Sequence, residues 1–246
     1  MKRFLFVLTA LLLSASLCDA RKLPAGALGT TTYEIRYTWG AIDAKVATAT
    51  ISLTPDSYQG KSAYHSHAFV KTSAVFRLFI GADLTVDSYI DEAELLPLYT
   101  INPYRKSGKD CKFEYIYDRE ARQVTNVAQG PKETLETKYP FDGRIFDLLT
   151  VLAFVRFLDA GDKPVSLRLM LGEAAYPAVI TYQGKDTERV PGVEADRFQI
   201  RLTERGVMEN GSGNELTFWR STGSDRRILG LEAAVNPGHM SIRIKQ

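Results

Sequence analysis

The sequence is poor in the residues and motifs that mark catalytic and metal sites. Its 246 residues include only two cysteines and three histidines. They contain no Gly-x-Ser-x-Gly nucleophile elbow, no phosphate-binding loop and no Gly-x-Gly-x-x-Gly dinucleotide fingerprint. Hydrolases, nucleotidases and dehydrogenases therefore lack their usual sequence support, and we assign no catalytic residue and expect no cofactor.

The chain also lacks an excess of charge of one sign. Its formal net charge is +2, and it falls to +1 if residues 1–20 are removed. A nearly neutral chain has no electrostatic footprint for nucleic acid or for an anionic membrane surface. No nucleic-acid partner is expected.

Long hydrophobic runs are missing except at the N-terminus, where residues 4–17 are apolar or small. This run follows Lys2 and Arg3 and is shorter than the roughly 20 residues that a membrane-spanning helix needs. The pattern is typical of a cleaved export signal. We predict cleavage after Ala20, a mature domain at residues 21–246 with no transmembrane span, and a periplasmic location.

An alternative is a membrane-anchored lipoprotein in which Cys18 is lipidated. Such processing favours a small residue before the cysteine, whereas Leu17 stands there in this chain. Cleavage after Ala20 would leave Cys111 as the one cysteine, so an intramolecular disulfide would be excluded. Stability would then rest on a hydrophobic core, which a chain of this length is able to bury.

Alternating polar and apolar residues predict that most of the chain is β-strand. In residues 31–39 the large side chains Tyr33, Ile35 and Tyr37 share one face, as a strand with one solvated face requires. The same rhythm, interrupted by turn-forming residues such as Pro55-Asp56, continues along the chain. Further strands are predicted at residues 44–54, 63–70, 84–90, 95–100, 112–118, 122–128, 165–171, 176–182, 195–203, 215–220, 228–235 and 240–244.

Residues 144–158 break this rhythm and predict a helix. They contain no Gly or Pro, Asp142 precedes them as an N-cap, and Gly161 follows near the C-terminal end. Asp147 near the start and Arg156 near the end agree with the helix dipole. Because apolar residues surround almost the whole helix, we expect it to be buried; a membrane-contacting helix would need a continuous polar face.

About a dozen strands around one helix, with no alternation of strands and helices, indicate an all-β, mainly antiparallel fold. We predict a single domain that is either an open curved sheet or a barrel-like fold, with the helix near residues 144–158 buried against it. No linker-like or low-complexity segment divides the chain.

Several short pieces, in their order along the chain, resemble one family. They are residues 33–37, Trp39-Gly40, 47–49, 86–91, Leu96-Pro97, 147–150, Val155-Arg156, Gly161-Asp162, Trp219 and 224–227. Together they resemble the exported bacterial proteins of the domain-of-unknown-function 3108 family. The resemblance implies an envelope protein of β architecture without an established activity, and it carries over no catalytic residue.

Two groups of residues are candidates for chemistry. His65 and His67 are two apart in a predicted strand, so their side chains share one face and form a weak candidate metal pair. No further ligand is marked by spacing, and we favour the interpretation that both histidines are ordinary strand residues.

The acids at positions 87, 91, 92 and 94 could supply an acid-base pair, although a solvated strand end is the simpler interpretation. Cys111 has no neighbouring His or Cys in the sequence and is expected to be idle.

Aromatic residues are the remaining signal, with 12 Tyr, 12 Phe and 2 Trp. A curved sheet with more aromatic surface than its helix covers would leave an apolar concavity, which is the usual form of a ligand site. We therefore expect a non-enzymatic binder of an apolar or amphipathic envelope ligand, such as a lipid or a lipid-linked glycan. A protein-protein interaction or scaffold module is the alternative, and a glycan-directed hydrolase is the third hypothesis.

Overall fold

The computed structural model describes residue 23 and residues 25–74, 83–106, 108–161, 163–172, 174–190, 192–203 and 214–245. The segment 1–20, with the predicted cleavage site and Cys18, lies outside them. The described chain forms a 15-stranded sheet, the α-helix α3 and two 3-10 helices. In chain order the elements are η1 (Ala25–Ala27), β1 (Gly29–Trp39), β2 (Ile42–Tyr58), β3 (Lys61–Thr72), β4 (Leu84–Asp91), β5 (Pro97–Lys106), β6 (Lys109–Asp118), β7 (Gln123–Gln129), β8 (Thr134–Pro140), β9 (Ile145–Phe146), α3 (Leu148–Phe154), η2 (Val155–Phe157), β10 (Val165–Leu171), β11 (Ala174–Val190), β12 (Val193–Leu202), β13 (Glu215–Ser221), β14 (Ile228–Ala234) and β15 (His239–Ile244).

The sheet is a continuous up-and-down arrangement that does not close. Its strand order runs from β8 back to β1, then through β15 down to β9. All neighbours pair antiparallel except β9, which pairs parallel with β10. The edge strands β8 and β9 are not paired with each other. The predicted curved antiparallel sheet is confirmed, and the open form is the one observed.

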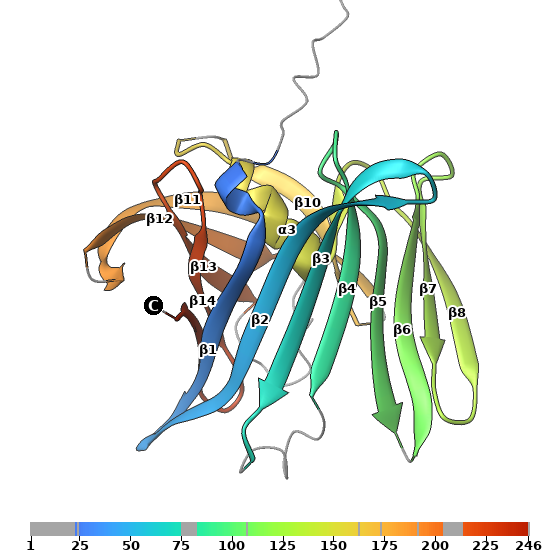
Figure 1. The fold of residues 1–246 in the computed structure, drawn as a ribbon, viewed down its shortest axis with the longest axis horizontal. Coiled ribbons are helices and arrows are strands. Elements are labelled where there is room, and N and C mark those ends of the chain that lie inside the picture. The colour runs from blue at the N-terminus through green and yellow to red at the C-terminus, as the bar shows by residue number, and fades with distance from the viewer. Residues whose placement is uncertain are drawn as a thin grey trace, which may run out of the picture.

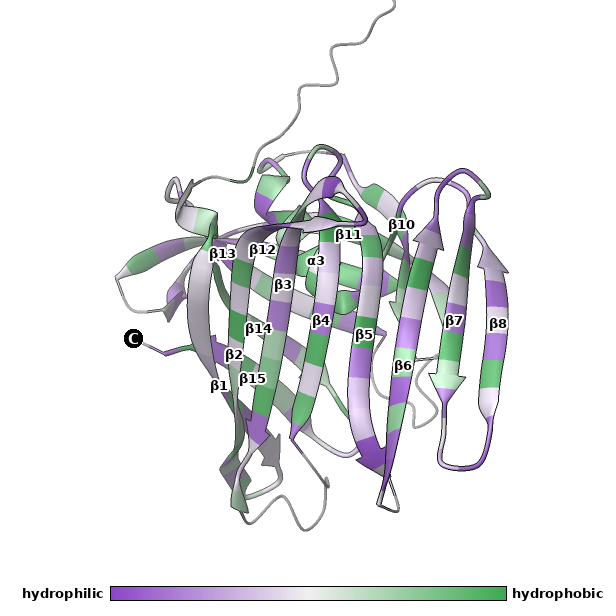
Figure 2. Cartoon of the chain, turned by 45° about the vertical axis from the view of Figure 1, so that its right-hand side comes forward, coloured by the Kyte–Doolittle hydropathy of each residue, from purple (hydrophilic) through white to green (hydrophobic). Residues whose placement is uncertain are grey.

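The sheet curls so that two walls face each other across α3. Strands β1–β8 form one wall, β10–β14 lie behind it, and α3 is seen between them in both views (Figures 1 and 2). Hydrophobic and hydrophilic bands alternate along the strands of the front wall (Figure 2), as expected when one face of a strand is buried. The largest buried cluster joins α3 to β10–β14, and a second joins it to β2–β4.

Most predicted strands are present, and the differences have local causes. The predicted turn at Pro55-Asp56 is wrong, because β2 runs through it to Tyr58. The partner strand β1 begins at Gly29, opposite Leu53, so β2 is an edge beyond that point and a proline is tolerated there. Strand β8 was not predicted, because it is short, almost all of its residues are exposed, and only Leu135 and Tyr139 in it are large and apolar.

The helix is shorter than predicted and begins at a different cap. The first residues of the predicted segment, Ile145–Phe146, form β9, and α3 starts at Leu148. Its N-cap is Asp147 rather than Asp142, whose side chain is exposed. The Asp147 carboxylate accepts hydrogen bonds from the backbone N–H groups of Leu149 at 2.8 Å and Thr150 at 3.1 Å. Among the described residues, none of the helices has the length and apolarity needed to cross a membrane.

Asp147 also attaches the start of α3 to the front wall. It is only 3% exposed. Its carboxylate accepts hydrogen bonds from Thr100 Oγ1 on β5 at 2.7 Å, from Ser88 Oγ on β4 at 3.3 Å and from Tyr117 Oη on β6 at 3.5 Å. A buried carboxylate needs such donors to offset its loss of hydration.

Arg220 attaches the other end of α3 to the opposite wall. This β13 residue is 2% exposed, and its guanidinium donates to the carbonyl oxygens of Val155, at 3.0 Å, and Leu158. Its charge is balanced by Asp196 on β12, with Nη2 and Oδ2 2.6 Å apart. The helix is therefore fixed at both ends, each time by a buried charged side chain.

Replacing Asp147 by alanine should destabilise the protein by roughly 3 kcal/mol, because the helix loses its cap and three buried hydroxyl groups lose their acceptor. The matched control is Asp142→Ala, which removes an exposed acid paired only with Arg122 and should cost less than about 1 kcal/mol. Urea unfolding measures both changes. Equal shifts of the two midpoints would contradict the assignment of the cap.

Candidate functional site

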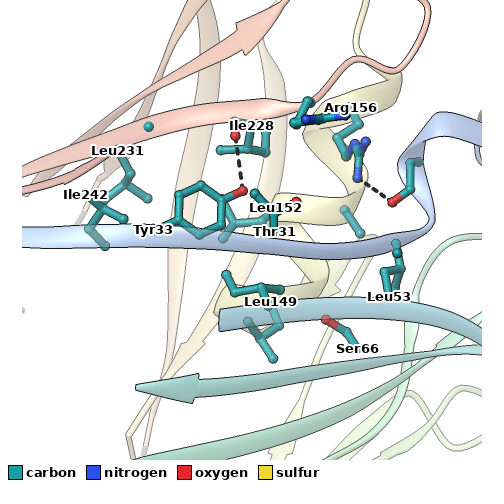
Figure 3. Close-up of a pocket in the computed structure, with 16 residues that line it drawn as sticks. Thr31, Tyr33, Leu53, Ser66, Leu149, Leu152, Arg156, Ile228, Leu231 and Ile242 are labelled. Carbon is teal, nitrogen blue, oxygen red and sulfur yellow. Dashed lines mark hydrogen bonds between the residues drawn. The ribbon is translucent and has the colours of Figure 1, made fainter. Parts of the chain in front are cut away.

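A cavity of about 90 Å³ lies between α3 and the inner face of the sheet. It is bounded by β1, β2, β14 and β15, with η1 at one end (Figure 3). Most of its wall is aliphatic, from side chains on both the helix and the sheet. The main apolar contributors are Ile51, Leu53, Leu149, Leu152, Leu231 and Ile242.

Small residues keep this space open. Ala153 on α3 and Ser66 on β3 both line the cavity with short side chains. Gly230 on β14 also lines the cavity, and its missing side chain lets β14 lie close to β15, because an added Cβ would be 2.6 Å from the carbonyl oxygen of Ile242. Close-packed interiors rarely leave spaces larger than a water molecule, so this apolar cavity is the leading candidate for a ligand site.

Tyr33 supplies the phenol of the cavity wall. Its hydroxyl donates to the carbonyl oxygen of Ile228, 3.1 Å away on β14. Burial raises the pKa of Tyr33 to about 12, although the nearby Arg156 opposes the shift. The phenol is therefore neutral near pH 7, and its hydroxyl proton is donated to the backbone carbonyl of Ile228.

Two arginines lie at one end of the cavity. Arg156, at the end of the helical segment, is held by carbonyl oxygens: Nε contacts Arg226 at 3.0 Å, Nη1 contacts Ala27 at 2.9 Å and Nη2 contacts Asp225 at 2.6 Å. Arg227 pairs with the Asp225 carboxylate at 3.1 Å and keeps 48% of its side chain exposed. In Figure 3, Arg156 lies at the opposite end of the view from Leu231 and Ile242.

A second pocket of about 340 Å³ lies beside the opening of the sheet, between the β6–β7 turn and the β8–β9 connection. Arg119 and Arg122 line it, but each already has an acidic partner. Arg119 pairs with Glu94, and Arg122 lies 3.5 Å from Asp142 in an exposed pair. The walls of this second pocket come mainly from turns rather than from the helix and the inner face of the sheet, so we take the apolar cavity beside α3 as the candidate site.

His65 and His67 do share one face of β3, as their spacing predicts. The alternate residue Ser66 lines the inner cavity, so the histidines point outward. Both rings bond to the same carboxylate oxygen of Asp87 on β4: His65 Nε2 at 2.8 Å and His67 Nδ1 at 2.7 Å. The His65 ring also stacks on Tyr89. Within the described ranges, no group of three or more His, Cys, Asp or Glu residues could hold a metal ion.

The acidic cluster does not converge. Asp87 and Asp91 are four positions apart on β4, about 13 Å, which exceeds the separation of a glycosidase acid pair. Asp91 instead accepts hydrogen bonds from the backbone N–H groups of Ala93 and Glu94, both at 2.9 Å, and so closes the turn after the strand. Cys111 is buried on β6, with its Sγ 3.7 Å from the carbonyl oxygen of Lys109.

The residues at the candidate site were missed by sequence reasoning. The aromatic surplus predicted an apolar concavity lined by aromatic surface. The cavity is apolar, but its wall is mostly aliphatic, and Tyr33 is the one aromatic residue among the described residues that line it. The individual residues Tyr33, Arg156 and Arg227 come from segments far apart in the chain. They meet because β1 pairs with β15, a contact between the two ends of the domain.

Comparisons with known proteins describe the fold and family. The family model "Protein of unknown function (DUF3108)" matches residues 32–241. The chain is similar to the crystal structure of a β-barrel-like protein of domain of unknown function DUF1849 from Brucella abortus. The TM-score is 0.53 at 8% identity, and the match covers 89% of this chain and 97% of that one. At this identity the similarity shows the fold alone. No curated protein matches the sequence.

Tyr33 should make stability fall at alkaline pH. The phenol ionises near pH 10 in the unfolded chain and near pH 12 in the folded protein. Its contribution to the free energy of unfolding is therefore fully present below pH 10 and is lost as the pH rises from 10 to 12. Raising the pH from about 9 to about 11 should cost roughly 1.4 kcal/mol through this group. Urea unfolding of wild type and Tyr33→Phe at both pH values isolates the contribution, which the variant should lack. An identical loss in both proteins would refute it.

Proposed function

This chain belongs to the DUF3108 family, and we propose that it is a non-enzymatic protein that binds the apolar end of an amphipathic molecule. The observation that carries the proposal is the aliphatic cavity between α3 and the sheet. Its wall includes Leu149 and Leu152 on one side and Ile51 and Ile242 on the other. Apolar cavities accept apolar guests.

The size of the cavity limits the ligand. Its volume of about 90 Å³ is below the roughly 150 Å³ of an engineered apolar cavity that holds benzene. It therefore accepts the end of a hydrocarbon chain rather than a complete lipid. The remainder of the molecule would extend out of the cavity.

A chain end alone would bind weakly. Each buried methylene contributes about 0.8 kcal/mol, so three or four contribute roughly 3 kcal/mol. A dissociation constant of 1 mM already requires about 4 kcal/mol. The ligand must therefore also be recognised outside the apolar part of the cavity.

We propose that this binding takes place in the bacterial periplasm. The support is the N-terminal sequence, in which Lys2 and Arg3 precede the apolar residues 4–17. Amphipathic envelope molecules such as lipids and lipid-linked glycans would then be the available ligands.

A scaffold function is less well supported. The open edge strand β8 is exposed, and an unpaired edge is able to accept a strand from another protein. However, β8 carries Glu136, Lys138 and Pro140, residue types that natural sheets use to block such pairing. The hydrolase hypothesis has less support still, because Asp87 and Asp91 are too far apart to act as a pair.

The proposal is tested first on protein purified from its native compartment. Native mass spectrometry should detect a bound molecule, and solvent extraction should release one that contains an alkyl chain. Uniformly ligand-free protein that also fails to bind added octan-1-ol would overturn the proposal.

Filling the cavity should abolish binding of octan-1-ol, a neutral chain-end probe. In methyl NMR spectra of the wild type, the alcohol should shift signals of Leu149, Leu152 and Ile242, with a dissociation constant of about 1 mM or weaker. Leu152→Trp should weaken binding at least about tenfold, because the indole would occupy the cavity.

The matched control is Leu148→Trp, which places the same side chain on the same helix at a position that is 41% exposed and outside the cavity. It should bind octan-1-ol like the wild type. Equal loss of binding in both variants, or methyl shifts confined to other parts of the protein, would place the apolar site elsewhere.

A further inference from the structure

Resting on the proposed function, we infer that the ligand is a single-chain amphiphile with an anionic head group, which the arginine end of the cavity recognises. The tail would lie toward Leu231 and Ile242, and the head would lie toward Arg156 (Figure 3). Arg227 is at the same end, because Arg156 bonds to the carbonyl oxygen of the preceding residue, Arg226. The shared chemistry is an alkyl chain that carries a carboxylate or a phosphate.

The first support is an excess of positive charge at this end. Arg156, Arg226 and Arg227 are close together, since Arg156 bonds to the backbone of Asp225 and Arg226. Arg226 pairs with Asp159 at 2.8 Å, and Arg227 pairs with Asp225 at 3.1 Å. Among the described residues, two of these three cations therefore have an acidic partner, and Arg156 forms no salt bridge.

The second support is how Arg156 is held. Carbonyl oxygens accept hydrogen bonds from its Nε, Nη1 and Nη2 atoms, and among the described residues no carboxylate forms a salt bridge with it. Carbonyl dipoles orient a guanidinium but do not cancel its charge. Burial lowers the pKa of Arg156, which reports that the cation has lost part of its hydration.

The acidic neighbour of Arg156, Asp225, already has other partners. The Asp225 carboxylate accepts a hydrogen bond from Ser221 Oγ at 2.7 Å and pairs with Arg227. Burial would raise its pKa, but the hydrogen bonds from Ser221 and from the Arg227 backbone outweigh it and lower the pKa. The neutral phenol of Tyr33 adds no negative charge.

The third support is the position of Arg227. Arg227 lines the cavity and is half exposed, so its side chain lies where the apolar wall meets solvent. An anionic head placed there would keep part of its hydration while gaining charge-assisted hydrogen bonds. This is the recognition outside the apolar wall that a short buried tail requires.

The test compares probes of one chain length by methyl NMR at about pH 7: octanoate, octyl phosphate, octan-1-ol and octylammonium. At least one anion should bind about tenfold more tightly than octan-1-ol, octylammonium should bind more weakly than the alcohol, and the preference should shrink with added salt. The anion with the larger advantage identifies the head group.

Arg227→Gln should remove the preference for anions while leaving the affinity for octan-1-ol unchanged. Arg227→Lys, which keeps the positive charge, should keep most of the preference for anions. Arg105→Gln, which removes an exposed cation on β5 paired with Asp110, is the matched control and should keep the preference. The methyl spectrum of each variant reports that the fold is intact.

The outcomes separate the two proposals. Equal affinity for octanoate, octyl phosphate and octan-1-ol would overturn the anionic head group and leave the apolar site in place. An anion preference that survives in Arg227→Gln would also overturn it. Absence of binding by all four probes would overturn the proposed function together with this inference.

Discussion

The buried carboxylate of Asp147 is the constraint on which the rest of the structure depends. It ends the two-residue strand β9, caps α3 and accepts hydrogen bonds from three strands of the front wall. A buried carboxylate is unfavourable unless its donors are in place, so the start of the helix and strands β4–β6 must adopt their positions together. Because the chain turns into a helix after two residues of β9, no full-length strand is available to pair with β8. The sheet consequently remains open.

The position of α3 determines the candidate site. Asp147 holds one end of the helix against the front wall, and Arg220 holds the other against β12 and β13. The face of α3 that carries Leu149, Leu152 and Ala153 then lies across β1, β2, β14 and β15. Short side chains such as Ala153 on the helix and Ser66 on β3 leave space between helix and sheet. The cavity results from a helix that is fixed at both ends over a largely aliphatic wall.

The topology explains how distant segments share this site. Strand β1 pairs with β15, and the Tyr33 hydroxyl reaches the carbonyl of Ile228, 195 positions away. Arg156 similarly links the end of the helical segment to η1 and to the turn before β14. These contacts bring an apolar cavity and an unpaired cation together at one place. That juxtaposition is the physical basis of the proposed recognition of an amphiphile.

The sequence by itself determined the class of fold, the family and the existence of a buried helix. Alternation in segments such as residues 31–39 reports which faces of the strands are buried. The apolar residues of segment 144–158 report a helix that is mostly buried, although Leu148 is exposed. It did not identify β8, a short exposed strand with only two large apolar residues. It also did not choose Asp147 over Asp142 as the cap, because the apolar run begins before Asp147 and placed that residue inside the predicted helix. Only the tertiary structure decided these points, together with the open edge and the residues around the cavity. The reason is that local patterns record whether a side chain is buried, whereas its partner depends on strand pairing between residues that are far apart in the chain.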